Sequence, residues 1–256
     1  MKEKQNKKGQ ITIWVILALV LVGVILLFFF LEKGPVRTAG KTFDSEQFME
    51  DCVQDAVTEA VNIMMPQGGF IDPKNFKIYN NTKIEYLCRN YGFYMPCLNQ
   101  HPMLISELNE EIRKQIAPRV ENCLESMEEE IERRGDSIEI GNEPAEINVS
   151  IAPNIVLVEM KKNVRITEKE SMKIFEKFDV RVASPIYNLA RVAISVVNDE
   201  RKYCYFEYVG YMTLDQSIDI RKFVMSDSTK IYTIKDKESG KEFNIAIRGC
   251  AIPAGI

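Results

Sequence analysis

The sequence predicts an α+β fold with an N-terminal transmembrane helix, then a helical half followed by a β-rich half with one further helix. Three observations support this class. Residues 11–31 form one uninterrupted apolar run. Between residues 44 and 136, apolar side chains recur every three or four residues, which is the spacing of helices. From residue 137 the spacing changes mainly to two, which is typical of strands.

The apolar run ITIWVILALVLVGVILLFFFL, residues 11–31, contains no charged side chain. As a helix it would be about 31 Å long, which matches a hydrocarbon core of ~30 Å. A removable secretory signal would be shorter and would end at a small-x-small cleavage site, which the following EKGPVRTAG lacks. We therefore expect a transmembrane helix over 11–33, between a basic cytoplasmic segment, 1–10, and a linker, 34–43.

Charge predicts the orientation of this helix. Residues 1–10 contain four lysines and one glutamate, and a positive flank favours the cytoplasm. Three basic residues also follow the run, so the asymmetry is modest. The prediction is a single-pass protein of the cell membrane, with its N-terminus cytoplasmic and its C-terminal domain extracytoplasmic.

The junction Lys8-Gly9-Gln10, followed by the apolar helix, resembles the class III signal peptide of archaeal type IV pilin-like proteins. This resemblance implies processing between Gly9 and Gln10, with the helix left attached to the mature chain. With a cysteine-containing domain after it, the chain also looks like the uncharacterised archaeal membrane-anchored surface proteins. That likeness brings no activity with it.

Two features depart from the pilin pattern. Bacterial type IV pilins carry glutamate at the fifth mature position, where this chain has Trp14. Gly34-Pro35 directly follows the predicted span, and proline disfavours helix in the residue before it. We therefore favour an anchor over the continuous spine of a filament subunit.

The predicted helical part, 44–136, begins with a helix capped by Asp44 or Ser45 and stopped at Pro66. A β-hairpin that turns at Asn80-Asn81 is expected next. A second helix covers 103–134, with a kink at Pro118 and a solvated, glutamate-rich second half. Residues 89–101 between the hairpin and this helix are irregular and aromatic.

The predicted β-rich part, 137–256, contains strands with turns at Gly141-Asn142 and Pro153-Asn154. Ser184-Pro185 then introduces one further helix, with serine as the cap and proline at the first position. Alternating residues between 218 and 247 predict the closing strands.

The chain contains six cysteines, all after the apolar run: Cys52, Cys88, Cys97, Cys123, Cys204 and Cys250. An even set confined to one side indicates an oxidising compartment, although buried free thiols are the main alternative. Fifteen full pairings exist. Position favours Cys88 with Cys97 around the aromatic stretch, Cys52 with Cys123 between the two helices, and Cys204 with Cys250.

Several chemistries find little support in the sequence. A net charge of −4 argues against nucleic-acid binding. The cysteines are spaced too widely for a zinc site, and His101 is the only histidine, so we expect no metal and no cofactor. A lone histidine is also poor material for a nucleophilic triad, and we expect no enzyme. Among 37 acidic residues, the sequence singles out no hydrolytic carboxylate pair.

Three aromatic residues, Tyr91, Phe93 and Tyr94, lie between Cys88 and Cys97 and form a candidate binding loop, with core filling as the alternative interpretation. A second aromatic cluster, residues 203–211, is interpreted mainly as core filling. Two N-x-Ser/Thr sequences make Asn80 and Asn148 candidate glycosylation sites.

These observations favour a membrane-anchored extracytoplasmic protein with a binding, adhesion or surface-assembly role. Its expected partners are the membrane and other surface proteins, pilin-like subunits or glycans. A minor pilin-like subunit of a cell-surface filament is one alternative, and a continuous helix through residues 11–50 would favour it. A membrane-anchored extracytoplasmic hydrolase is the other, and a deep pocket with two carboxylates would favour it.

Overall fold

The computed structural model describes residues 20–23, 43–168 and 171–253. The chain divides into two units, Met1–Phe43 and the larger Asp44–Ile256; of the first, residues 20–23 are described within a helix. The predicted processing site at Gly9 and Gln10 lies outside the described residues, as does the predicted linker up to residue 42.

Two long helices begin the larger unit. Helix α2 spans Ser45–Met64, and α3 spans Leu104–Arg133. The Asp44 side chain, one of the two caps that the sequence predicted, caps α2 by accepting a hydrogen bond from the Gln47 backbone N–H at 3.1 Å. A short 3-10 helix, η1 (Met65–Gln67), follows α2. Helix α3 is one continuous helix with Pro118 in its interior.

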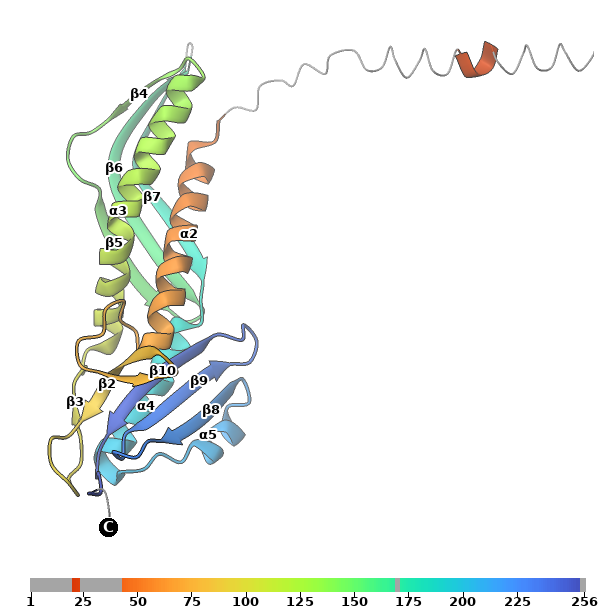
Figure 1. The fold of residues 1–256 in the computed structure, drawn as a ribbon. Coiled ribbons are helices and arrows are strands. Elements are labelled where there is room, and N and C mark those ends of the chain that lie inside the picture. The colour runs from red at the N-terminus through yellow and green to blue at the C-terminus, as the bar shows by residue number, and fades with distance from the viewer. Residues whose placement is uncertain (1–19, 24–42, 169–170, 254–256) are drawn as a thin grey trace, which may run out of the picture. The chain divides into compact units, whose positions relative to one another are not determined.

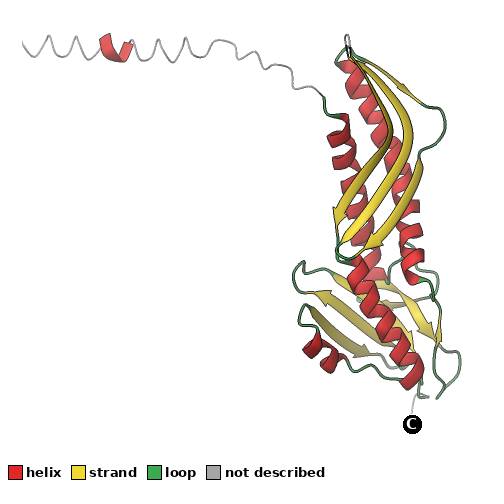
Figure 2. Cartoon of the chain, turned by 180° about the vertical axis from the view of Figure 1, so that it is seen from behind, coloured by secondary structure: helices red, strands yellow, loops and turns green. Residues whose placement is uncertain are grey.

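The first sheet contains one long strand paired on both edges. Its strands are β4 (Ser137–Ile140), β5 (Glu146–Ala152), β6 (Ile155–Glu168) and β7 (Ser171–Ala183). Strand β7 pairs along β6, whereas β5 and β4 share the other edge of β6 in succession. Helices α2 and α3 cover one face of this sheet (Figures 1 and 2). Apolar side chains of β6 and β7, such as Val158 and Val180, are buried against them.

The second sheet combines strands from both ends of the unit. They are β1 (Phe76–Tyr79), β2 (Thr82–Arg89), β3 (Leu98–Asn99), β8 (Ile218–Val224), β9 (Lys230–Asp236) and β10 (Glu242–Arg248). Their order is β1-β2-β10-β9-β8, with β3 also paired to β2. Helix α4 (Ile186–Tyr203) covers one face of the sheet, and α5 (Tyr208–Leu214) packs beside β8 (Figure 2).

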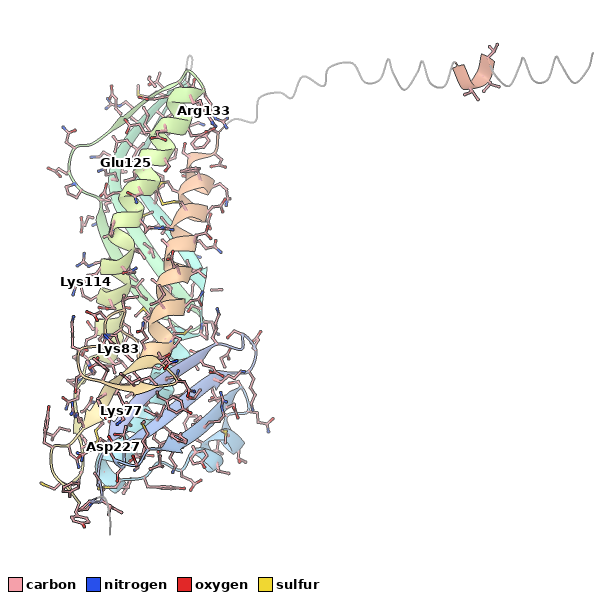
Figure 3. All side chains as sticks on the ribbon, viewed as in Figure 1. Lys77, Lys83, Lys114, Glu125, Arg133 and Asp227 are labelled. Carbon is pink, nitrogen blue, oxygen red and sulfur yellow. A yellow bond between two sulfur atoms is a disulfide. The ribbon has the colours of Figure 1, made fainter. Side chains whose placement is uncertain are left out.

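Exposed charges mark the solvent sides of these elements. Lys114, Glu125 and Arg133 lie along the exposed side of α3 (Figure 3). On the open face of the second sheet, Lys77 forms an ion pair of 2.6 Å with Asp227 (Figure 3). Both arrangements follow from the alternation of apolar and polar residues in the sequence.

The structure corrects the predicted fold class at its N-terminal end. Within residues 20–23, 43–168 and 171–253, no helix is both long enough and apolar enough to cross a bilayer. The two long helices, α2 and α3, carry charged side chains along one side. Only residues 20–23 of the predicted span, 11–33, are described.

Along the chain a helix-rich part, 44–136, is followed by a β-rich part, 137–253, as predicted, but the two parts interleave in space and share one unit. Strand β2, from the supposed helical half, lies in the middle of the second sheet, where it pairs in parallel with β10. Helices α2 and α3 lie on strands of the supposed β-rich half. Local periodicity identifies single elements, but it does not indicate pairing between distant segments.

Candidate functional site

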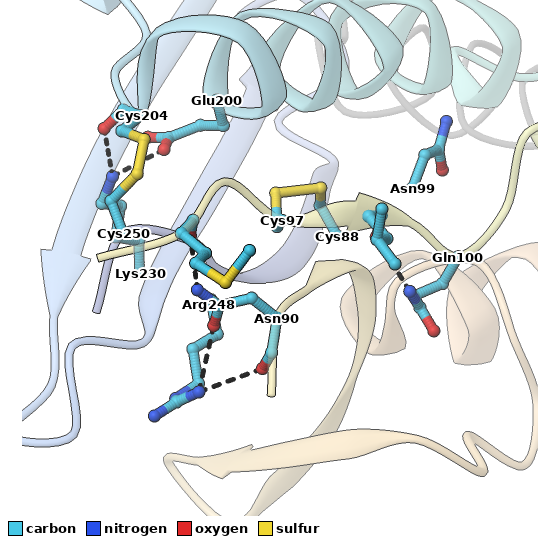
Figure 4. Close-up of a disulfide and its surroundings, with 12 residues drawn as sticks. Cys88, Asn90, Cys97, Asn99, Gln100, Glu200, Cys204, Lys230, Arg248 and Cys250 are labelled. Carbon is cyan, nitrogen blue, oxygen red and sulfur yellow. Dashed lines mark hydrogen bonds and ion pairs between the residues drawn. A yellow bond between two sulfur atoms is a disulfide. The ribbon is translucent and has the colours of Figure 1, made fainter. Parts of the chain in front are cut away.

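Three disulfides connect the described elements, and they are the pairs that position in the sequence favoured. Cys52 of α2 joins Cys123 of α3, with Cα atoms 6.1 Å apart. Cys88 joins Cys97 at 5.4 Å, and Cys204 joins Cys250 at 5.8 Å. The last two lie close together at one end of the second sheet (Figure 4). The Cys88–Cys97 bridge encloses the candidate binding loop, residues 89–96, which we call the aromatic loop.

The base of the aromatic loop is fixed by the fully buried Cys88–Cys97 bridge. Cys88 is the penultimate residue of β2, and Cys97 directly precedes β3, which pairs with β2 through Cys88 and Asn99. Gly249 packs against Cys97, because a Cβ atom at Gly249 would lie 3.3 Å from the Cys97 Cβ, N and Sγ atoms. The two ends of the loop are therefore held by a covalent bond and by close packing.

Asn90 organises the interior of the loop. Its side chain is 5% exposed, and its Nδ2 donates to the Met95 carbonyl at 2.5 Å. Arg248 of β10 donates from Nη1 to both the carbonyl and the Oδ1 of Asn90, each at 3.0 Å (Figure 4). One buried amide thus ties the start of the loop to its end and to the sheet.

The segment after β10 supports the other side of the loop. The Cys250 N–H donates to the Met95 carbonyl at 2.6 Å, and the Tyr94 N–H donates to the Ala251 carbonyl at 2.9 Å. Tyr94 has a φ of +60°, a left-handed conformation that bulky residues seldom adopt without support from their surroundings. The Cys204–Cys250 bridge anchors this segment to the end of α4.

This organisation leaves the aromatic side chains facing solvent. Tyr91 is 79% exposed, Tyr94 is 63% exposed and Phe93 is 49% exposed. The Arg89 guanidinium lies 5.3 Å from the centre of the Tyr91 ring, and that of Arg248 lies 5.7 Å from the centre of the Phe93 ring. These are cation–π distances, so the arginines restrict the positions of two exposed rings.

Apolar neighbours extend the exposed surface. Met95 is 62% exposed, Leu98 is 67% exposed and Ile252 is 53% exposed. The loop between β2 and β3 extends past the end of the second sheet (Figure 1). The resulting feature is a projecting apolar surface on a rigid support.

A buried ion pair strengthens this support beside the Cys204–Cys250 bridge. Glu200 of α4 is fully buried and lies 2.5 Å from the Lys230 Nζ, which also donates to the Cys204 carbonyl at 2.6 Å. The Tyr232 hydroxyl donates to the other oxygen of Glu200 at 2.5 Å. Burial and the Glu200 carboxylate raise the pKa of Tyr232 well above its usual range, so the phenol stays protonated.

His101 lies between two carboxylates where β3 leads into α3. Its Nδ1 lies 2.5 Å from the Glu107 Oε2, and its Nε2 lies 3.6 Å from the Glu85 Oε1. The Glu85 carboxylate also accepts hydrogen bonds from the Lys74 and Asn75 backbone N–H groups. Burial opposes the charged imidazolium, but the two carboxylates outweigh it and raise the pKa of His101. These contacts connect α3 to the second sheet.

No metal-binding group emerges from the described part of the chain. Within it, no set of three or more His, Cys, Asp and Glu side chains is arranged to hold a metal ion. All six cysteines are in bridges. The polar network around Glu200 links α4 to β9, and the Glu200 carboxylate is itself fully buried.

The two candidate glycosylation sites lie on different kinds of backbone. Asn80 is exposed in the turn between β1 and β2, whereas Asn148 is exposed within β5. The second aromatic cluster is mixed, because Phe206 is buried while Tyr203 and Tyr205 are exposed.

Sequence reasoning found the exposed rings but missed their supports. Arg248 and the segment 249–251 lie far from the loop along the chain, and no local pattern associates them with it. Asn90 gave a weak signal as a polar residue beside an aromatic stretch. Arg89 resembled an ordinary strand-end charge.

Comparison with known proteins adds no relative: no family model matches the chain, and no curated protein or solved structure matches it.

Proposed function

We propose that residues 44–253 form an extracytoplasmic binding domain that docks a partner protein through the aromatic loop. The observation that carries this proposal is the exposure of Tyr91, Phe93 and Tyr94 on a loop fixed by two disulfides. Three bridges among six cysteines support an oxidising location, where disulfides persist.

Rigidity is the first reason to assign binding to this loop. Ordering a flexible loop opposes association by about 0.5–1.5 kcal/mol for each side chain that must be immobilised. Here the backbone is already held by the hydrogen bonds of Asn90, Tyr94 and Cys250. Two of the rings also lie against arginines. Much of this conformational entropy is therefore lost when the domain folds, and its loss does not oppose association with a partner.

The composition of the surface favours a protein over a glycan. Tyrosine and arginine are the residues most often found at the energetic centres of protein interfaces. Met95, Leu98 and Ile252 extend the patch with aliphatic and thioether groups, which suit an apolar protein surface. A sugar site would need polar groups that converge around the rings, but the Asn90 amide is turned inward and bonded.

The partner can be identified by site-specific photo-crosslinking in the cells that produce the protein. One photoreactive residue replaces Met95, and a control replaces Met172 of β7, since these side chains are exposed to 62% and 60%. We expect a discrete protein adduct from position 95 and not from position 172. Equal labelling from both positions, or none from position 95, would contradict the proposed docking surface.

Affinity for the captured protein then tests the role of the rings. Replacing Tyr91 or Tyr94 by Ser should weaken binding, by about 30-fold for a loss of ~2 kcal/mol at one hot spot. The control replaces Ile174 by Ser, because that side chain is 60% exposed on β7. Unchanged affinity in both tyrosine variants would remove the loop from the interface. The native protein should also gain mass on reduction, because each opened bridge adds two hydrogens; a mass that does not change would contradict the oxidising location.

A further inference from the structure

We infer that Asn80 is an attachment site for an N-linked glycan and that Asn148 is not. The inference concerns a modification outside the aromatic loop, but it rests on the proposed extracytoplasmic location. Both residues begin an N-x-Ser/Thr sequence, so the sequence alone does not separate them. Their backbone surroundings do.

Asn80 and Asn81 are the two central residues of the β1–β2 turn. Strand pairing closes directly outside them, at Tyr79 with Thr82. Their φ angles are +48° and +62°, which belong to a two-residue hairpin turn of type I′. Such a turn directs its side chains away from the sheet, and both asparagines are exposed. Within the described residues, the Asn80 side-chain amide has no hydrogen-bond partner, so no interaction must break for it to react.

The reaction uses groups that this turn presents. The Asn80 side-chain nitrogen attacks the anomeric carbon of a glycan carried on a lipid phosphate, in the active site of a glycan transferase. The bond from that carbon to the phosphate oxygen breaks, the lipid phosphate leaves with the electron pair, and the amide nitrogen loses one proton. Thr82, two residues on, supplies the hydroxyl of the acceptor sequence at the very start of β2.

Asn148 lies in a much more constrained segment. It is in the middle of β5, where Asn148, Val149 and Ser150 pair with Glu159, Val158 and Leu157 of β6. Val149 is only 5% exposed. The Asn109 side chain of α3 also accepts a hydrogen bond from the Ile151 N–H at 2.8 Å. A transferase could bind this sequence only after β5 had left both β6 and α3, which the folded domain opposes.

The hairpin can tolerate the sequence changes that a test requires. Lys77 and Lys83, on its two strands, lie on the second sheet (Figure 3), and Lys77 pairs with Asp227. Residue 82 is a strand position, so valine suits it at least as well as threonine. The substitution Thr82→Val therefore removes the acceptor hydroxyl while it leaves Asn80 and the turn in place. Thr82→Ser keeps the hydroxyl and serves as the matched control.

The experiment is intact-mass and glycopeptide analysis of the full chain, purified from the cells that naturally produce it. Wild type, Thr82→Ser and Asn148→Gln should carry the same glycan mass on the peptide that contains Asn80. Thr82→Val and Asn80→Gln should lack it, with thermal unfolding used to verify that both variants fold. A wild-type Asn80 without glycan, or a glycan on Asn148, overturns the inference. Reduction of the same samples separates the two proposals, because intact bridges without glycan reject only the glycan, whereas free thiols reject the location as well.

Discussion

Removing the Cys52–Cys123 bridge should destabilise the domain more than removing the Cys88–Cys97 bridge, because it closes the longer segment of chain. The joined residues are 71 positions apart in the first bridge and 9 apart in the second. In the chain-entropy model, stabilisation grows with the logarithm of this separation, which gives about 4.4 kcal/mol for the first bridge and about 2.6 kcal/mol for the second. The expected difference in unfolding free energy is therefore about 1.8 kcal/mol.

Urea unfolding without reductant measures this difference on two double variants, Cys52→Ala/Cys123→Ala and Cys88→Ala/Cys97→Ala. Alanine is used because at least one cysteine of each bridge is buried, where a serine hydroxyl would add its own cost. The slope of the transition should be compared as well, because removal of a cross-link also expands the unfolded chain. Equal losses in the two variants, or a larger loss without Cys88–Cys97, would refute the reasoning from chain length.

Three further predictions concern single residues. Glu200→Gln should lower the unfolding free energy by about 3–5 kcal/mol, because it leaves the partly buried Lys230 ammonium without its counter-charge. The control Glu242→Gln, in an exposed ion pair, should lower it by less than about 1 kcal/mol. Equal losses in urea unfolding would argue against a stabilising buried pair. The pKa of His101 is raised, so the stability that its charged form contributes is fully present below about pH 6.5 and is lost as pH rises through the folded-state pKa. Wild type should therefore lose unfolding free energy relative to His101→Gln over that rise. Parallel pH profiles of the two proteins would contradict this. Gly249→Ala should lower the unfolding free energy by about 1–3 kcal/mol, because a Cβ at this position crowds the bridged Cys97, whereas Gly92→Ala should be nearly neutral. Matching melting temperatures for the two variants would exclude crowding at residue 249.

Local signals were sufficient for several elements. The Asn80-Asn81 pair predicted the β1–β2 hairpin because few residues tolerate the positive φ angles of its turn. Asp44 predicted the start of α2 because a carboxylate can satisfy a free N–H in the first turn. The three disulfide pairs followed from the positions of the cysteines on these elements. For the hairpin and the helix cap, the residues that cause the structure lie within a few positions of it, whereas the disulfide pairs followed from the order of the elements that carry the cysteines.

Long-range contacts were beyond these signals. Strands β2 and β10 pair in parallel across most of the chain, and the alternation in each strand is satisfied equally well by any apolar neighbour. The support of the aromatic loop by Arg248 and Asn90 depends on that pairing, so it was missed with it. Helix α5 was missed for another reason: none of its residues is buried, so it has no apolar stripe to recognise.

The same pairing explains why the proposed binding surface depends on residues far from its rings. Strand β10 places Arg248 under the loop, and the residues beyond it donate to and accept from the loop backbone. Those residues are held in turn by Cys204 at the end of α4, where Glu200 and Lys230 fix the helix to the sheet. The exposed rings are therefore positioned by the core of the second sheet through an unbroken series of bonded contacts. A loop supported in this way cannot adapt its shape to many partners, which favours recognition of one complementary surface.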